Sequence, residues 1–167
     1  MKSKNIIFGI GIFLVVALLS VIIILLTKER QEVSANLDFS KIKETVPNLK
    51  KDDENIFGLL MEITDSTLLD LYGIDPSLME EYYGQTSALM VHSSMFLIIK
   101  PLDGKEDEVK EQVAEYMLKL EEQWKIYLPS QYSLVINRLE TKLGDYLIYI
   151  VSVDNDLVLN TIKEAKK

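Results

Sequence analysis

The one histidine of the chain stands beside two serines, residue types found together in nucleophilic hydrolases. His92 is followed by Ser93 and Ser94 in "VHSS". On a strand, residues 92 and 94 share a face, so a Ser94–His92 pair is geometrically possible. The stretch has no G-x-S-x-G nucleophile elbow, and no particular acid can be assigned to orient the histidine. We therefore interpret "VHSS" as a loop or strand end that leads into the apolar run "MFLIIK".

Metal and cofactor chemistry finds little support in the residue types. Catalytic zinc needs three protein ligands, usually from His and Cys, and the chain has one histidine and no cysteine. The stretch from Asp154 begins like a calcium loop, but Leu159 replaces its glycine and Ala165 its closing glutamate. No phosphate-binding glycine motif is present. We expect no catalytic residue, no metal and no cofactor.

Two other kinds of site remain open. Two carboxylates across a cleft would suit sugar hydrolysis, and acids are abundant. Tyr72, Tyr82 and Tyr83 are our candidate ligand or partner surface, an aromatic platform for a glycan or peptide. The alternative is that these tyrosines are ordinary strand and core residues.

The charge of the chain is divided unevenly along its length. Residues 31–167 carry 14 of the 18 basic and 25 of the 26 acidic side chains, a formal net charge of −11. Such a domain repels nucleic acid and anionic lipid, so we expect no nucleic-acid partner. A simpler reading is that the acidity keeps the domain soluble.

The N-terminus carries the strongest single signal. Residues 6–26, "IIFGIGIFLVVALLSVIIILL", contain no charge. A helix of this length spans roughly 32 Å, which matches a hydrocarbon core of about 30 Å. We predict a transmembrane anchor over residues 1–27, with a signal peptide cleaved after Ala35 as the alternative. Basic residues flank both sides equally; the acidic, cysteine-free remainder favours a cytoplasmic N-terminus and an extracytoplasmic domain.

The remaining residues divide into a stalk and a domain. Residues 28–55 are polar and charged, and they predict a stalk with one short helix, capped by Asp38 or Ser40 and ended by Pro47. Residues 56–167 predict the domain. A short helix closes at Gly73. The pattern of residues 77–89 is ambiguous, and we favour extended structure that leads into a strand. A strand over 95–101 is apolar on both faces, so it should lie inside a sheet.

The strongest helix of the domain runs from a cap at Asp103 to Pro129. Its apolar stripe predicts a core-facing side, and Glu106–Lys110, Glu115–Lys119 and Glu121–Lys125 have the spacing of helical ion pairs. The stripe consists of Val109, Val113, Tyr116, Met117, Leu120, Trp124 and Tyr127.

A hairpin and a helix complete the domain. Residues 132–142 and 146–153 predict a hairpin that turns at Gly144, and an amphipathic helix follows Asp154 or Asn155. The fold class is therefore α+β: a largely antiparallel sheet of about four strands, packed by one long helix and shorter helices, behind an N-terminal transmembrane helix.

Four stretches carry a resemblance to a known family: "YGID" (72–75), "FLIIKPLDGKEDEV" (96–109), "EQWKIYLPSQ" (122–131) and "GDYLIYIVSVD" (144–154). Their order and spacing resemble the Gram-positive family of domain of unknown function 4358, over about residues 37–165. The resemblance implies a membrane-attached extracytoplasmic domain without established activity or catalytic residues. Members are often lipoproteins, but this chain lacks the cysteine that lipid attachment needs.

These observations predict an uncharacterised single-pass membrane protein whose extracytoplasmic domain is a non-catalytic interaction or accessory module of the cell envelope. Its expected partners are the membrane, through residues 6–26, and an envelope protein that the sequence does not identify. The alternatives are an envelope hydrolase with a carboxylate pair and a ligand-sensing domain.

Overall fold

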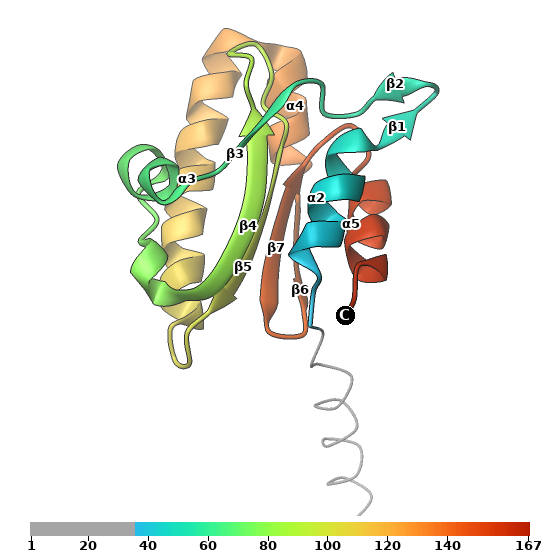
Figure 1. The fold of residues 1–167 in the computed structure, drawn as a ribbon. Helices are drawn as coiled ribbons and strands as arrows, with labels where there is room; N and C mark the ends of the chain where they lie inside the picture. The colour runs from blue at the N-terminus through green and yellow to red at the C-terminus, as the bar shows by residue number, and fades with distance from the viewer. Residues whose placement is uncertain (1–35) are drawn as a thin grey trace, which may run out of the picture. The chain divides into compact units, whose positions relative to one another are not determined.

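The computed structural model describes residues 36–167, which form one compact α+β unit (Figure 1). The predicted anchor at residues 6–26 lies outside the described residues. Within residues 36–167, no helix combines the length and the apolar character that a membrane crossing requires.

The centre of the domain is a five-stranded sheet in which every neighbouring pair of strands is antiparallel. The strand order is β3-β4-β5-β7-β6. The bounds are β3 Leu60–Glu62, β4 Met79–Ser87, β5 Met95–Pro101, β6 Leu139–Leu143 and β7 Tyr146–Val151. The antiparallel α+β class is confirmed, with one strand more than the four expected. The additional strand is β3, whose three residues are too short to show an alternating pattern.

The two central strands supply the core on both faces of the sheet. Residues of β5 from Met95 to Ile99 and all of β7 are buried, which confirms the interior position predicted from their apolar faces. Because side chains alternate along a strand, Leu97 and Ile99 pack on one side of the sheet and Phe96 and Ile98 on the other. The sheet therefore lies between two apolar layers.

The first layer is built by α3 (Glu106–Tyr127) and α4 (Pro129–Ile136). The predicted stripe of α3 is buried from Val109 to Trp124 except at Leu120, which is partly buried, whereas Tyr127 is exposed. Asp103 is not the cap. A turn with left-handed Gly104 (φ 75°) delays the helix start, and Lys105 precedes it without a side-chain cap.

The segment that becomes α4 was predicted as a strand, and this prediction is wrong. Its run "YSLVI" has apolar and β-branched residues, which favour a strand locally. In the structure, Pro129 occupies the first turn of α4, where its missing N–H costs nothing, and Val135 is fully buried in the first layer. Tertiary packing therefore overrides local preference here, and only β6 remains of the first hairpin arm.

The second layer is built by α2 (Phe39–Thr45) and α5 (Asn155–Glu164). Asp38 caps α2 through the N–H groups of Ser40 and Lys41, and Asp154 caps α5 through the N–H of Leu157, as the sequence predicted. Within the predicted stalk, Ile42 and Val46 are fully buried, so residues 36–55 belong to the same compact unit as the sheet. A small hairpin follows, formed by β1 (Lys50–Lys51) and β2 (Glu54–Asn55).

The connection from β3 to β4 contains the predicted short helix. It runs over Thr67–Tyr72 with π-helical hydrogen bonding, and it ends at left-handed Gly73 (φ 72°), as the glycine predicted. A 3-10 turn, Pro76–Leu78, then leads into β4. We call Thr67–Tyr72 the π-turn below. Single π-helical turns occur often at functional sites.

Candidate binding cleft

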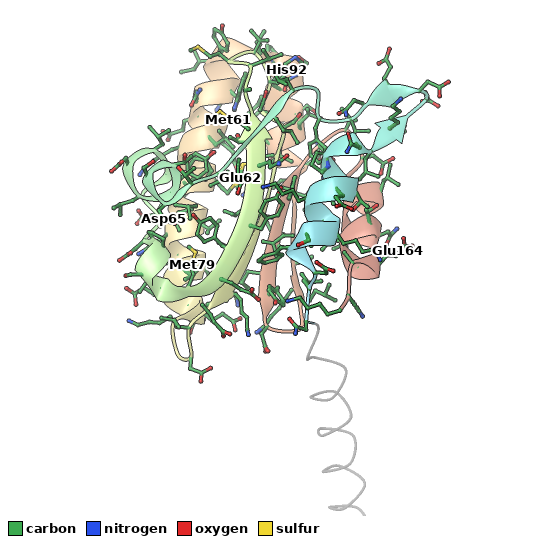
Figure 2. The ribbon with its side chains drawn as sticks, in the orientation of Figure 1. Met61, Glu62, Asp65, Met79, His92 and Glu164 are labelled. Atoms are coloured by element: carbon green, nitrogen blue, oxygen red, sulfur yellow. The ribbon has the colours of Figure 1, made fainter. Side chains whose placement is uncertain are left out.

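The "VHSS" stretch forms a loop at one end of the sheet and then enters β5. His92 is exposed there, as Figure 2 shows, while Ser93 and Ser94 are buried. The N–H of Ser93 donates to Oε1 of Gln131 (2.9 Å), and its hydroxyl lies 3.2 Å from the Gln131 carbonyl oxygen. The serine therefore attaches the loop to α4. The interpretation of "VHSS" as a loop entering a strand is confirmed.

His92 and Ser94 also line a hollow of about 400 Å³ beneath the β1–β2 hairpin, together with Asp52 and Glu54. Within residues 36–167, no hydrogen bond joins these four side chains to one another. The same part of the chain contains no group of three or more His, Asp or Glu that is placed to hold a metal ion. The hollow thus lacks the connected pairs of a hydrolytic site.

The three candidate tyrosines do not form one surface. Tyr72 is buried in the first layer, where it stacks on Tyr116 with ring centroids 4.0 Å apart. Tyr83 is buried on the opposite side of the sheet, and burial raises the pKa of its hydroxyl to about 12. Tyr82 lies partly exposed and donates a hydrogen bond to Asp65. The pKa of the Tyr82 hydroxyl is raised, first by burial and second by this hydrogen bond.

Two of these tyrosines still share a surface hollow. Tyr82 and Tyr83 line a hollow of about 630 Å³ together with Glu62 and Asp65. Figure 2 labels these two acids at the β3 side of the sheet. Glu62 is paired with Lys43 across 2.9 Å, so one of the two acids is already neutralised. Whether these tyrosines contact a ligand stays a prediction.

A different opening has the features of a binding site. It is a cleft of about 390 Å³ where the π-turn, the 88–94 loop and α3 meet, and we call it the Trp124 cleft. The sequence analysis did not find it, because its residues come from three separate stretches of the chain, 71–72, 86–95 and 116–124. Its lining comprises Leu71, Tyr72, Thr86, Ser87, Leu89, Met90, His92, Ser93, Met95, Tyr116, Lys119, Leu120, Gln123 and Trp124.

The rim of the Trp124 cleft is apolar and open to solvent. Met90 is 90% exposed, Leu71 is 74% exposed and Leu89 is 43% exposed. Large apolar side chains gathered around one opening are typical of interaction sites, whereas single exposed ones are common everywhere. The rim therefore offers apolar contact area that residues 36–167 do not cover.

Trp124, one of the residues that line the cleft, carries a hydrogen-bond donor without an acceptor. Trp124 is 3% exposed, and its Nε1 is the one enclosed side-chain nitrogen or oxygen, among residues 36–167, that has no hydrogen-bond partner. An enclosed donor without an acceptor costs about 1–3 kcal/mol in a folded protein. The sequence identified Trp124 only as a packing residue, because its hydrogen bonding depends on which loop lies above it.

The charge of the cleft differs from that of the rest of the domain. None of its fourteen lining residues is acidic, and Lys119 and His92 are its only basic side chains. The predicted Glu115–Lys119 pair is absent, and no ion pair between residues 36 and 167 involves Lys119. Glu121, also expected to pair along α3, reaches Arg138 instead. The cleft is thus a non-acidic site on an acidic chain.

Comparison with known families gives one match. Residues 53–152 match the sequence model of a family described as Domain of unknown function (DUF4358), which covers more than half of the chain. The chain belongs to this family. The matched DUF4358 segment includes all five strands of the sheet and every residue of the Trp124 cleft, while α2 and α5 lie outside it. No curated protein and no solved structure matches the chain.

Proposed function

We propose that this DUF4358 protein is a non-catalytic interaction module of the cell envelope, anchored in the membrane by residues 6–26, whose Trp124 cleft receives a segment of an envelope protein. The observation that carries the proposal is the combination of an exposed apolar rim with an enclosed indole N–H that lacks an acceptor. A partner segment would cover the rim, and a shift of the side chains that enclose the indole N–H would let the segment supply its acceptor.

The position of the cleft supports this role. The described chain begins at Asn36, beside the C-terminal residues Lys166 and Lys167, and His92 lies at the opposite end of the sheet (Figures 1 and 2). The cleft, which His92 lines, therefore lies at the end of the sheet away from residue 36. The acidic surface also disfavours an anionic lipid bilayer as the occupant of the cleft.

The two alternatives have weaker support. An envelope hydrolase needs two acids facing each other across a cleft, and the Trp124 cleft has none. The hollow lined by His92, Asp52 and Glu54 contains suitable residue types, but its side chains are not joined. A ligand-sensing domain would use the same cleft with a small molecule as its occupant.

Site-directed photo-crosslinking in cells tests the proposed function. A photoreactive phenylalanine analogue at Met90 is expected to give one discrete adduct, identified by mass spectrometry as an envelope protein. Leu118 provides the matched control, because it is 60% exposed on α3 and lies outside the cleft. A second substitution on the rim, Leu71→Glu, should remove the Met90 adduct. The same adducts from both positions, or none from Met90, would contradict the proposal.

A further inference from the structure

We infer that the Trp124 cleft binds the free carboxyl terminus of a polypeptide that ends in an apolar residue. This inference rests on the proposed function and names the chemistry of the segment that the partner supplies. It follows from three properties of the cleft: its unused donors, its charge and its dimensions.

The donors of the cleft lie along one helix face. Lys119 and Gln123 are separated by four residues on α3, and Leu120 and Trp124 form the adjacent row with the same separation. Residues four apart are neighbours on a helix surface, so a polar row lies beside an apolar row. Among residues 36–167, the Lys119 ammonium has no ion-pair partner and the Trp124 indole has no acceptor. A ligand complementary to this face carries acceptor atoms beside an apolar group.

The charge of the cleft selects an anion as that acceptor. The lining carries Lys119 and His92 and no carboxylate, although acids outnumber basic residues in the chain by 26 to 18. A carboxylate placed beside Lys119 is attracted by the ammonium, and no acidic residue of the lining repels it. Ion pairs with good hydrogen bonding are stronger than neutral hydrogen bonds, and a carboxylate has two oxygens for two donors.

The dimensions and the walls of the cleft favour a peptide over a fatty acid. A volume of about 390 Å³ is suited to one or two residues, and a folded element would need a longer groove. The walls include the hydroxyl of Thr86 and the amide of Gln123, polar groups able to pair with a peptide backbone. A lipid chain would instead require an apolar channel. The exposed side chains of Leu71 and Met90 are placed to cover the last apolar residue of the peptide.

The position of Trp124 provides a direct assay. It is the only tryptophan of the chain and lies in the cleft, so its fluorescence reports ligand binding locally. The full-length protein in lipid nanodiscs is titrated with acetyl-Leu-Leu bearing a free carboxylate, with the same dipeptide as its C-terminal amide, and with octanoate. The free acid should shift the emission saturably, and the amide and octanoate should bind at least about tenfold more weakly, which equals about 1.4 kcal/mol.

Two matched variants test the residue that selects the carboxylate. Lys119→Gln should weaken binding of the free acid to the level of the amide and leave amide binding unchanged. Lys125→Gln, on the same helix but outside the cleft lining, should leave both affinities unchanged. Because both lysines are exposed, neither change should disturb folding. Circular dichroism checks that the variants fold.

Three results would overturn the carboxyl-terminus assignment: equal affinity for acid and amide, octanoate binding as tightly as the peptide acid, or no saturable change up to about 10 mM ligand. The outcome separates this inference from the proposed function. A Met90 crosslink to an envelope protein without peptide binding would leave the interaction module standing and refute the carboxylate. Peptide binding without any Met90 adduct in cells would support the carboxylate site and refute the interaction with an envelope protein.

Discussion

At the scale of single residues, Trp124 combines packing with an unused hydrogen-bond donor. We predict that Trp124→Ala lowers the free energy of unfolding by about 3–5 kcal/mol, because it empties a buried position. Trp124→Phe keeps an aromatic ring and removes the donor that lacks an acceptor, so its cost should remain below about 1.5 kcal/mol. Urea denaturation followed by circular dichroism measures both.

His92→Ala is the control for this pair, because His92 is exposed and its side chain makes no described hydrogen bond. Its effect on stability should stay within about 0.5 kcal/mol. If Trp124→Ala denatures like the native protein, α3 does not pack as described. If His92→Ala preserves stability but abolishes the Met90 crosslink, the loop has a functional role beyond structure.

Gly84 shows how closely the strands approach one another. A Cβ added there would lie 2.6 Å from the carbonyl oxygen of Phe96 and 2.9 Å from Cδ1 of Leu97. The oxygen belongs to the central strand β5 and cannot move without disturbing the sheet. We predict that Gly84→Ala destabilises the domain by about 1–3 kcal/mol, measured by its urea midpoint. A change smaller than about 0.5 kcal/mol would show that β4 has room to relax.

The residue-scale predictions failed or succeeded for identifiable reasons. Tyr72, Tyr82 and Tyr83 were grouped by type and proximity in sequence. The alternation of side chains along β4 places Tyr82 and Tyr83 on opposite faces, which the pattern alone could have indicated. The unpaired N–H of Trp124 could not be predicted, because part of the cleft around Trp124 is built by residues 71–95, which are distant from it in the sequence.

At the scale of elements, periodicity predicted most of the fold. The all-apolar strands β5 and β7, the stripe of α3 and the capped helices α2 and α5 each have a strong local signal that agrees with the packing. The failures, β3 and α4, are short elements determined by their neighbours. The Trp124 cleft could not be predicted because no single element contains it.

The second layer gives a prediction about the limits of the folding unit. The matched family segment, residues 53–152, omits α2 and α5. Without them, the buried face formed by Phe96, Ile98, Ile148 and Ile150 would be open to water. We predict that a fragment of residues 53–152 lacks a cooperative urea transition, whereas residues 36–167 unfold in one step. A cooperative transition of the shorter fragment with an equal m-value would contradict the role assigned to α2 and α5.

One ion-pair cluster links α3 to β6 and predicts a pH dependence. Glu106 accepts hydrogen bonds from Lys110 (2.6 Å) and Lys142 (2.5 Å), and both lower its pKa, Lys110 more strongly. A carboxyl whose pKa is lower in the folded state contributes stability above its unfolded pKa of about 4.3, and this contribution is lost as the pH falls through the folded value. The contribution is small, because the Glu106 side chain is 35% exposed and solvent screens its ion pairs.

The test compares the native protein with Glu106→Gln by thermal melts between pH 7 and pH 3. The melting temperature of the native protein should fall more steeply below about pH 4.5 than that of the variant. Glu108→Gln is the control, since the only ion pair of Glu108 among residues 36–167 is with Lys105, which directly precedes α3. Parallel curves for the native protein and Glu106→Gln would show that the cluster does not contribute to stability.

At the scale of the whole molecule, the sequence predicted the class of protein better than it predicted individual sites. High apolar content and net negative charge pointed to an acidic globular domain, and the order of the predicted elements gave its α+β class. The family match and the antiparallel sheet agree with that class. The same acidity makes the non-acidic Trp124 cleft conspicuous, because the surrounding field favours cations while the cleft itself presents Lys119.

The last prediction concerns the topology of the full chain. Residues 6–26 contain 21 uncharged residues, long enough to span a bilayer, whereas residues 31–167 carry a net charge of −11. Lys2 and Lys4 balance Lys28 and Arg30, so flanking charge does not decide the orientation.

We predict that protease added to intact, wall-stripped cells degrades the domain and spares residues 1–27. Lysed cells control for protease access to a cytoplasmic domain. Complete protection in intact cells with digestion after lysis would place the domain inside the cell, and a mature chain beginning near Asn36 would establish a cleaved signal peptide instead of an anchor.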